Sequence, residues 1–137
     1  MNVKYYLDYN EQLNENEIVS EFINLYYTNI STKNLFSVIN LFDINAKCIY
    51  NDKEYIGIHN VYSSHMTEGI NKIIYDKIAY TSTVIDNLTL LIQVSGNCQG
   101  IYFWNQKTKT RKFVETFIIN YSNEQIIVSN YILKFVD

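Results

Sequence analysis

The order of its secondary-structure patterns constrains the fold of this chain more than any other feature of the sequence. A helical pattern that carries Tyr26 and Tyr27 comes first, and long β-patterned runs fill the second half up to Phe135. The chain contains no proline, so nothing interrupts these runs. Several strand patterns are apolar on both faces, and such a sheet needs a cover on each side. We therefore expect an α+β, cone-like fold, in which a curved, mostly antiparallel sheet wraps around a long N-terminal helix with two short helices beside it.

The first half of the chain carries the helical signals. Asn14 opens a sequence that resembles a capping box, and apolar residues then recur at i, i+4, i+7 and i+8 from Ile18. This spacing predicts a helix that ends near Asn29. A second start signal, Ser31-Thr32, predicts a short helix that closes near Asp43.

The remaining elements follow from period-two patterns and turn residues. Lys47 to Asn51 and Glu54 to Ile56 are expected to form a small hairpin around Asp52-Lys53. A short helix is expected from Ile58 to His65. The longest β-patterned runs predict a four-stranded antiparallel meander, made of Ile73 to Ile85, Leu88 to Cys98, Phe113 to Tyr121 and Ile126 to Phe135.

Length and composition indicate one folded domain and argue against several classes of protein. The 137 residues suit one domain, which we expect to span residues 14–137 behind a flexible N-terminal arm of residues 1–13. No apolar run approaches the roughly 20 residues that span a bilayer. The net charge of -3 gives no global reason to bind nucleic acid. Cys48 and Cys98 lack the spacing of a zinc or redox site, so we expect neither a metal nor a cofactor.

Five blocks of the sequence, in order, resemble those of the nuclear transport factor 2-like domain. They are Glu21 to Tyr27, Tyr55 to Gly57, Val94 to Gly96, Phe113 to Phe117 and Val128 to Ile132. The resemblance covers roughly Ile18 to Phe135 and implies a cone-shaped domain that forms a homodimer through its sheet. This agrees with the apolar outer face of the strands, which would be costly to leave in water. The positions expected at the dimer interface are Gln93, Thr116, Asn130 and Ile132.

A closer resemblance is to the N-terminal domain of the stress-granule scaffold proteins that bind Ras-GTPase-activating protein. In that group, two helices and the last strand form a slot for short peptides that contain Phe-Gly. The resemblance implies a slot lined by Ile18, Phe22, Leu41 and Ile126, with Leu25 and Gln125 at its rim. Ordinary core packing explains each of these residues equally well. We expect a non-catalytic, homodimeric adaptor for Phe/Gly-containing linear motifs, like the stress-granule scaffolds or like the proteins of nucleocytoplasmic transport.

Ran GTPase, a partner of the transport factor itself, is not expected to bind. The positions that resemble the Ran-binding acids are Asn51 and the segment Gln99 to Lys112, where basic residues replace acids. Charge reversal at close range costs several kcal/mol. The expected compartment is the cytoplasm, with the nucleus or the nuclear envelope as alternatives, because the N-terminus lacks the apolar segment of a secretory signal.

The main alternative function is small-molecule binding, or isomerase- or dehydratase-like catalysis that uses Asp76, in the cavity of the cone. Ketosteroid isomerases and scytalone dehydratases of the same superfold react their substrates inside the cone. The candidate acid–base groups here are Asp76, His59 and His65. The pattern around Asp76 does not fix which face of its strand it occupies, and the histidines lie on or after a short surface helix. We therefore do not expect an enzyme.

Nucleic-acid contact is a second alternative. The segment from Tyr102 to Lys112 interleaves aromatic and basic residues, which can stack bases and neutralise phosphates. A hairpin with a lysine-rich tip is, however, more often a solvated edge that resists aggregation. We therefore do not expect nucleic acid as a partner.

Overall fold

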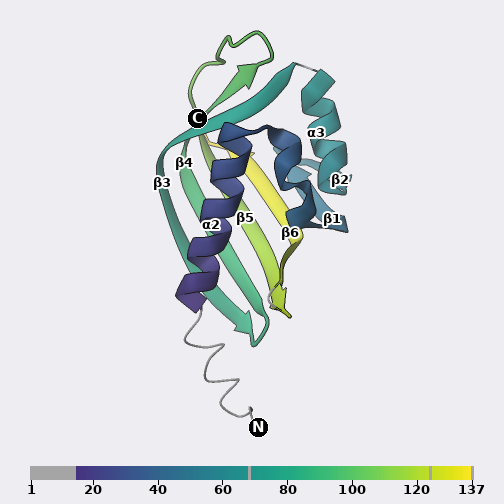
Figure 1. Cartoon of the computed structure of the whole chain (residues 1–137), viewed down its shortest axis with the longest axis vertical. Coiled ribbons are helices and arrows are strands. Elements are labelled where there is room, and N and C mark those ends of the chain that lie inside the picture. The colour runs from purple at the N-terminus through teal and green to yellow at the C-terminus, as the bar shows by residue number, and fades with distance from the viewer. Residues whose placement is uncertain (1–14, 68, 124, 137) are drawn as a thin grey trace.

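The computed structural model describes residues 15–67, 69–123 and 125–136, so the predicted arm of residues 1–13 lies outside the described residues. The helices are α2 (Glu15–Thr32), the 3-10 helix η1 (Leu35–Leu41) and α3 (Ile58–Thr67). The strands are β1 (Phe42–Tyr50), β2 (Lys53–Ile56), β3 (Ile70–Asp86), β4 (Thr89–Tyr102), β5 (Arg111–Ser122) and β6 (Gln125–Phe135). The sheet curves around α2, with η1 and α3 on the same side (Figure 1).

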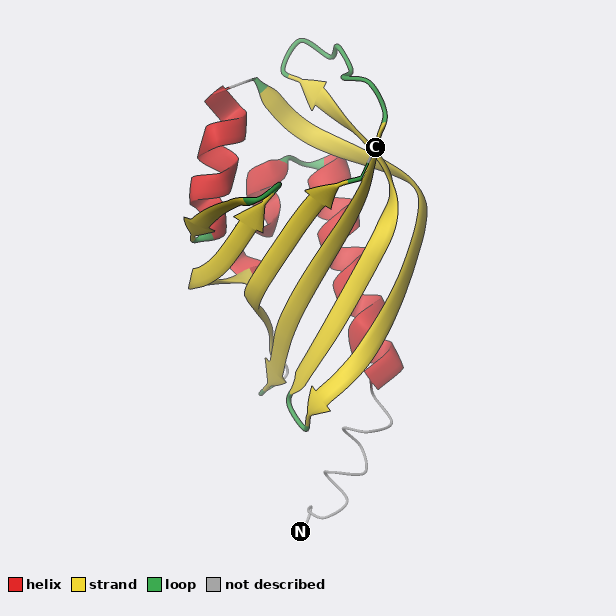
Figure 2. Ribbon diagram, turned by 180° about the vertical axis from the view of Figure 1, so that it is seen from behind, coloured by secondary structure: helices red, strands yellow, loops and turns green. Residues whose placement is uncertain are grey.

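The six strands form one mixed sheet in the order β2-β1-β6-β5-β4-β3. The predicted meander is confirmed, because β3 to β6 pair antiparallel in chain order; β4 continues to Tyr102 rather than ending at Cys98. Figure 2 shows the other face of the sheet, over which no helix of the described residues lies. The predicted α+β, cone-like fold is therefore confirmed, with a sheet that does not close into a barrel.

The predicted hairpin is present, but its turn and its neighbours differ from the prediction. The turn comprises Asn51 and Asp52 rather than Asp52 and Lys53, and its two residues have positive φ values of 47° and 78°. Asn and Asp tolerate this conformation better than most residues. β1 begins at Phe42 instead of Lys47 and pairs parallel with β6, which attaches the hairpin to the main sheet.

The boundary between the first two helices also differs from the prediction. α2 continues to Thr32, beyond the predicted end near Asn29, and the Thr32 hydroxyl donates to a carbonyl one turn earlier at 2.6 Å. Ser31-Thr32 therefore closes α2 and does not start the next helix. Asn34 caps η1 instead, with its side-chain oxygen accepting from the backbone N–H of Phe36 at 2.9 Å.

β3 bends at a bulge between Asp76 and Ala79, where Lys77 has a φ of 57°. Gly96 of β4 lies opposite, and a Cβ at this position would meet the Asp76 carbonyl oxygen at 3.0 Å. The two backbones thus approach too closely for a larger residue. Before the bulge, Tyr75 packs against the core while Asp76 is exposed.

Aromatic rings fill the interior around the middle of α2. Phe22 is fully buried and packs edge-on against Phe117, with ring centroids 4.8 Å apart. Tyr26 contacts the same Phe117 ring at 4.9 Å, and Phe117 contacts Tyr131 at 5.3 Å. Such pairs stabilise a core beyond the area that they bury. This cluster fixes α2 on the sheet, and the interior is hollow toward the C-terminal half of the helix.

Candidate functional sites

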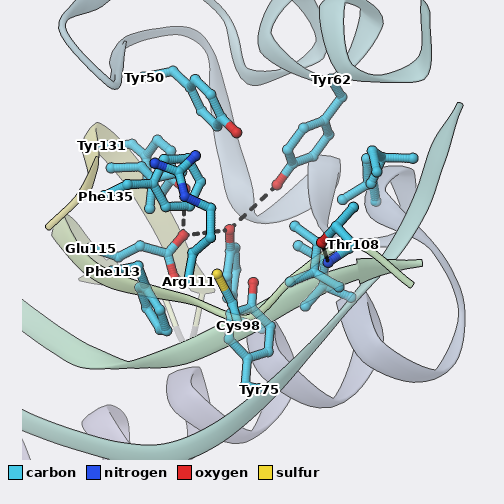
Figure 3. A pocket seen from close by; sticks show the side chains of 17 residues that line it. Tyr50, Tyr62, Tyr75, Cys98, Thr108, Arg111, Phe113, Glu115, Tyr131 and Phe135 are labelled. Atoms are coloured by element: carbon cyan, nitrogen blue, oxygen red, sulfur yellow. Dashed lines mark hydrogen bonds between the residues drawn. The ribbon is translucent and has the colours of Figure 1, made fainter. Parts of the chain in front are cut away.

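A cavity of about 240 Å³ lies inside the cone. Its walls are mainly aromatic and aliphatic, and they come from every helix and from every strand except β2. Tyr50, Thr108 and Arg111 are only partly buried, so they form its rim, whereas Tyr26 and Glu115 are 1% and 2% exposed and form its floor. Figure 3 shows these side chains converging on the hollow.

Glu115 is the only carboxylate among the described residues that line the cavity. It reaches the interior because alternate residues of β5 face the same side, so Phe113, Glu115 and Phe117 all point inward. A glutamate between two inward-facing phenylalanines, Phe113 and Phe117, is the signal that could have revealed this site from the sequence alone. The sequence reasoning missed it.

Tyrosine hydroxyls surround the Glu115 carboxylate. The Tyr27 hydroxyl donates to Oε1 at 2.7 Å, and the Tyr131 hydroxyl donates to Oε2. The Tyr26 hydroxyl lies 3.4 Å from Oε2 and also 3.4 Å from the hydroxyl of Tyr62 (Figure 3). Both carboxylate oxygens therefore have close partners, while Tyr26 and Tyr62 are linked only loosely.

Burial controls the ionisation of this cluster. It raises the pKa of Glu115 above its ordinary value, and the hydrogen bonds from the tyrosines oppose this effect without cancelling it. Burial, followed by the negative charge of Glu115, also raises the pKa values of Tyr26, Tyr27, Tyr75 and Tyr131. The tyrosines therefore stay protonated and act as hydrogen-bond donors.

The structure does not assemble the acid–base group considered from the sequence. The interpretation that places Asp76 in the cavity is wrong, because Tyr75 takes the inward position beside it and Asp76 is exposed. His59 is exposed on α3, and the side chain of His65 is not among those described. Among the described residues, no histidine or lysine lines the cavity.

The six residues predicted to form a peptide slot lie on α2, η1 and β6, and both α2 and β6 contact η1. We call this set the α2–η1–β6 seam: Ile18, Phe22, Leu25, Leu41, Gln125 and Ile126. Ile18, Phe22 and Ile126 are buried in the core at 7%, 0% and 8% exposure. Leu25 and Leu41 are partly exposed and Gln125 is exposed. The accessible part of the seam is therefore its predicted rim together with Leu41.

The four residues predicted at a dimer interface lie on the outer face of the sheet. Gln93, Thr116 and Ile132 are directly paired across β4, β5 and β6, so they form one row. Asn130 lies in the next row, opposite Ile118. Ile132 is 42% exposed, and no described helix covers it (Figure 2). We call these rows the outer face.

The tip of the β4–β5 hairpin presents exposed aromatic and basic side chains. Phe103 and Trp104 are 54% and 61% exposed, and Trp104 stacks on Tyr102 with ring centroids 4.7 Å apart. Lys107 and Lys109 are exposed in the same loop. This composition agrees with the solvated tip that the sequence predicts.

The described residues contain no group of three or more side chains that could hold a metal ion. Neither Cys48 nor Cys98 forms a disulfide bond with a described residue. None of the described helices is long and apolar enough to cross a membrane.

No protein-family profile matches the sequence, and no curated protein is similar to it. Solved structures are similar in fold. Nuclear transport factor 2 from Cryptosporidium parvum has a TM-score of 0.73 and 14% identity, over 90% of this chain and 95% of that chain. The yeast UBP3-associated protein BRE5 has a TM-score of 0.59 and 18% identity, over 88% and 95%. A putative scytalone dehydratase from Novosphingobium aromaticivorans has a TM-score of 0.74 and 7% identity, over 93% and 88%.

These similarities show that the chain has the nuclear transport factor 2-like fold. The proteins that share it include a transport factor, a protein associated with another protein and a putative dehydratase. The fold therefore does not choose between an adaptor and an enzyme, and the choice depends on the sites.

Proposed function

We propose that this chain is a non-catalytic, homodimeric adaptor that binds short Phe-containing linear motifs at the α2–η1–β6 seam. The observation that carries the proposal is the arrangement of this seam. Two partly exposed leucines, Leu25 and Leu41, flank buried apolar residues of three elements, and the exposed amide of Gln125 lies at the start of β6. Partly exposed apolar side chains beside an exposed amide suit contact with an aromatic side chain of a peptide.

The hydrogen bonding of Glu115 supports binding over catalysis. A general acid or base must exchange a proton with its substrate. The two oxygens of Glu115 instead accept hydrogen bonds from Tyr27 and Tyr131, and no histidine is among the described side chains that line the cavity. The alternative function, an isomerase or dehydratase, would require Glu115 to give up these partners.

The outer face supports pairing with a second copy. Thr116 lies at the centre of the row that joins Gln93 to Ile132, and partly buried Leu91, Val114 and Ile118 surround it. These side chains are β-branched, aliphatic or amide groups without charge, and a two-fold axis through Thr116 would bring like rows of two copies together. Such pairing would leave the seam accessible, because α2 and η1 lie on the other side of the sheet (Figure 1).

The similarity to nuclear transport factor 2 and to BRE5 agrees with this proposal. The partners would be proteins that carry Phe-Gly-type motifs, in transport or in stress-granule-like assemblies of the cytoplasm. Neither Ran GTPase nor nucleic acid is part of the proposal.

A peptide titration tests the seam. Peptides of the Phe-Gly-Asp-Phe and FxFG types are added to the ¹⁵N-labelled protein, and the amide shifts of α2, η1 and β6 are followed. We expect at least one peptide to shift the signals of Leu25 and Gln125, since these residues bound the seam on two elements. The Leu25→Lys variant should lose this response, because it replaces an apolar contact by a charge.

Asn24→Lys is the matched control, because it places the same side chain at the neighbouring exposed position of α2. It should bind like the wild type. The seam would be excluded as the binding site if neither peptide shifts these signals, or if both lysine variants bind equally well.

A further inference from the structure

We propose that the cone cavity is a binding site for a small, neutral ketone or aldehyde that carries one ring. Its carbonyl oxygen would accept hydrogen bonds from the hydroxyl groups of Tyr62 and Tyr75. Nothing in the adaptor proposal requires this site, which lies inside the cone rather than at the seam.

The size and the walls of the cavity set the apolar part of the ligand. An engineered apolar cavity of about 150 Å³ holds benzene, and drug-sized ligands use pockets of about 300 to 1,000 Å³. The 240 Å³ observed here suits one ring with a short substituent. Phe113, Phe135, Ile73 and Leu133 are among the walls, so the ring would be held by apolar and aromatic contacts.

Incompletely bonded tyrosine hydroxyls set the polar part of the ligand. The Tyr75 hydroxyl makes no hydrogen bond with any described residue, and that of Tyr62 has a single partner, Tyr26, at the long distance of 3.4 Å. Both side chains line the cavity, and in Figure 3 their hydroxyl groups point into it. Tyr62 is 4% exposed and Tyr75 is partly buried, so an acceptor placed between them would give each hydroxyl a hydrogen bond that the folded chain supplies poorly or not at all.

The electrostatics of the floor select the kind of acceptor. Burial raises the pKa values of Tyr62 and Tyr75, so their hydroxyl groups stay protonated and act as hydrogen-bond donors to a ligand. Glu115 lies within 3.4 Å of the Tyr26 hydroxyl, and its negative charge disfavours an anionic ligand at this end of the cavity. A carbonyl oxygen is neutral and can accept two hydrogen bonds. It thus matches the donors better than a carboxylate does.

Three compounds of similar shape test the assignment. Acetophenone carries the carbonyl, α-methylstyrene replaces its oxygen by a CH₂ group, and benzoate replaces its methyl group by a charged oxygen. Each is titrated into the full chain, and the dissociation constant is obtained from the shifts of cavity amides. We expect acetophenone to bind about three- to tenfold more tightly than α-methylstyrene, and benzoate to bind most weakly.

Removing single hydroxyl groups locates the carbonyl. Tyr62→Phe and Tyr75→Phe should each reduce the preference for acetophenone over α-methylstyrene while leaving the affinity for α-methylstyrene unchanged. Tyr80→Phe makes the same change on a tyrosine that is 44% exposed and does not line the cavity, so it should have no effect. Ile73→Phe, which narrows the cavity, should weaken the binding of all three compounds.

The outcomes separate the parts of the proposal. If none of the compounds shifts a cavity amide, the cavity is not a ligand site. If acetophenone and α-methylstyrene bind equally well, or if Tyr62→Phe and Tyr75→Phe behave like Tyr80→Phe, the assignment of a carbonyl ligand is overturned.

Discussion

Glu115 is a charged residue at a position in the core where an apolar residue would be expected. It is 2% exposed on the inner face of its strand, and it is solvated by tyrosine hydroxyls instead of water. The sequence contains the signal for this residue, a glutamate between Phe113 and Phe117. It contains no signal for its partners, because Tyr27 and Tyr131 come from distant segments that only the folded chain brings together. For a related reason, the sequence does not determine which face of β3 Asp76 occupies. No local pattern predicts the bulge that follows this residue.

The raised pKa of Glu115 predicts how stability depends on pH. The folded chain holds this proton to a higher pH than the unfolded chain does. The free energy of unfolding should therefore fall as the pH rises from the ordinary value of 4.5 through the raised pKa, and then level off. Urea unfolding of the wild type and of Glu115→Gln over this range isolates the effect. The stability of the wild type relative to the variant should decrease with pH, and a difference that stays constant or increases would contradict the assignment.

Phe22 is predicted to act mainly through stability. Its ring is fully buried against Phe117 and Tyr26, so Phe22→Ala should destabilise the chain by about 3 to 5 kcal/mol. Leu25→Ala, one turn further along α2 at the partly exposed rim of the seam, should reduce the free energy of unfolding by clearly less. Chemical denaturation of both variants measures this difference. Equal losses would mean that Phe22 is not the core residue described here.

The sequence predicts the helices and strands better than it predicts how the strands pair and where the helices end. The long helix, α3 and the four strands of the meander follow from spacing and period, and all are present. The parallel pairing of β1 with β6 joins segments that are far apart in the chain, and no local pattern encodes it. The end of α2 was also mispredicted, because Ser31-Thr32 is a start signal by type but lies within the last turn of the helix.

The bulge in β3 is predicted to depend on the absence of a side chain at Gly96. Gly96→Val should destabilise the chain by about 1 to 3 kcal/mol, because its Cβ would meet the backbone oxygens of Asp76 and Lys77 at 3.0 and 3.2 Å. Ser95→Val is the control, since this neighbouring side chain is exposed and valine favours strands. Thermal unfolding compares the two variants. A Gly96→Val variant as stable as Ser95→Val would show that the close approach is not required.

In the whole molecule, the two faces of the sheet have different roles. The inner face holds α2 and encloses the cavity, and the outer face is free of helices in the described residues (Figures 1 and 2). The sequence predicts this division from strands that are apolar on both sides. The central claim is that a second copy covers the outer face.

Sedimentation equilibrium at micromolar concentration tests this claim most directly, with the wild type beside Thr116→Lys and Thr28→Lys. Thr116 is at the centre of the outer face, whereas Thr28 is exposed on α2. The account predicts twice the 16.2 kDa of one chain for the wild type and for Thr28→Lys, and the mass of a single chain for Thr116→Lys. A wild type that sediments as a monomer, or a Thr116→Lys variant that remains a dimer, would contradict it.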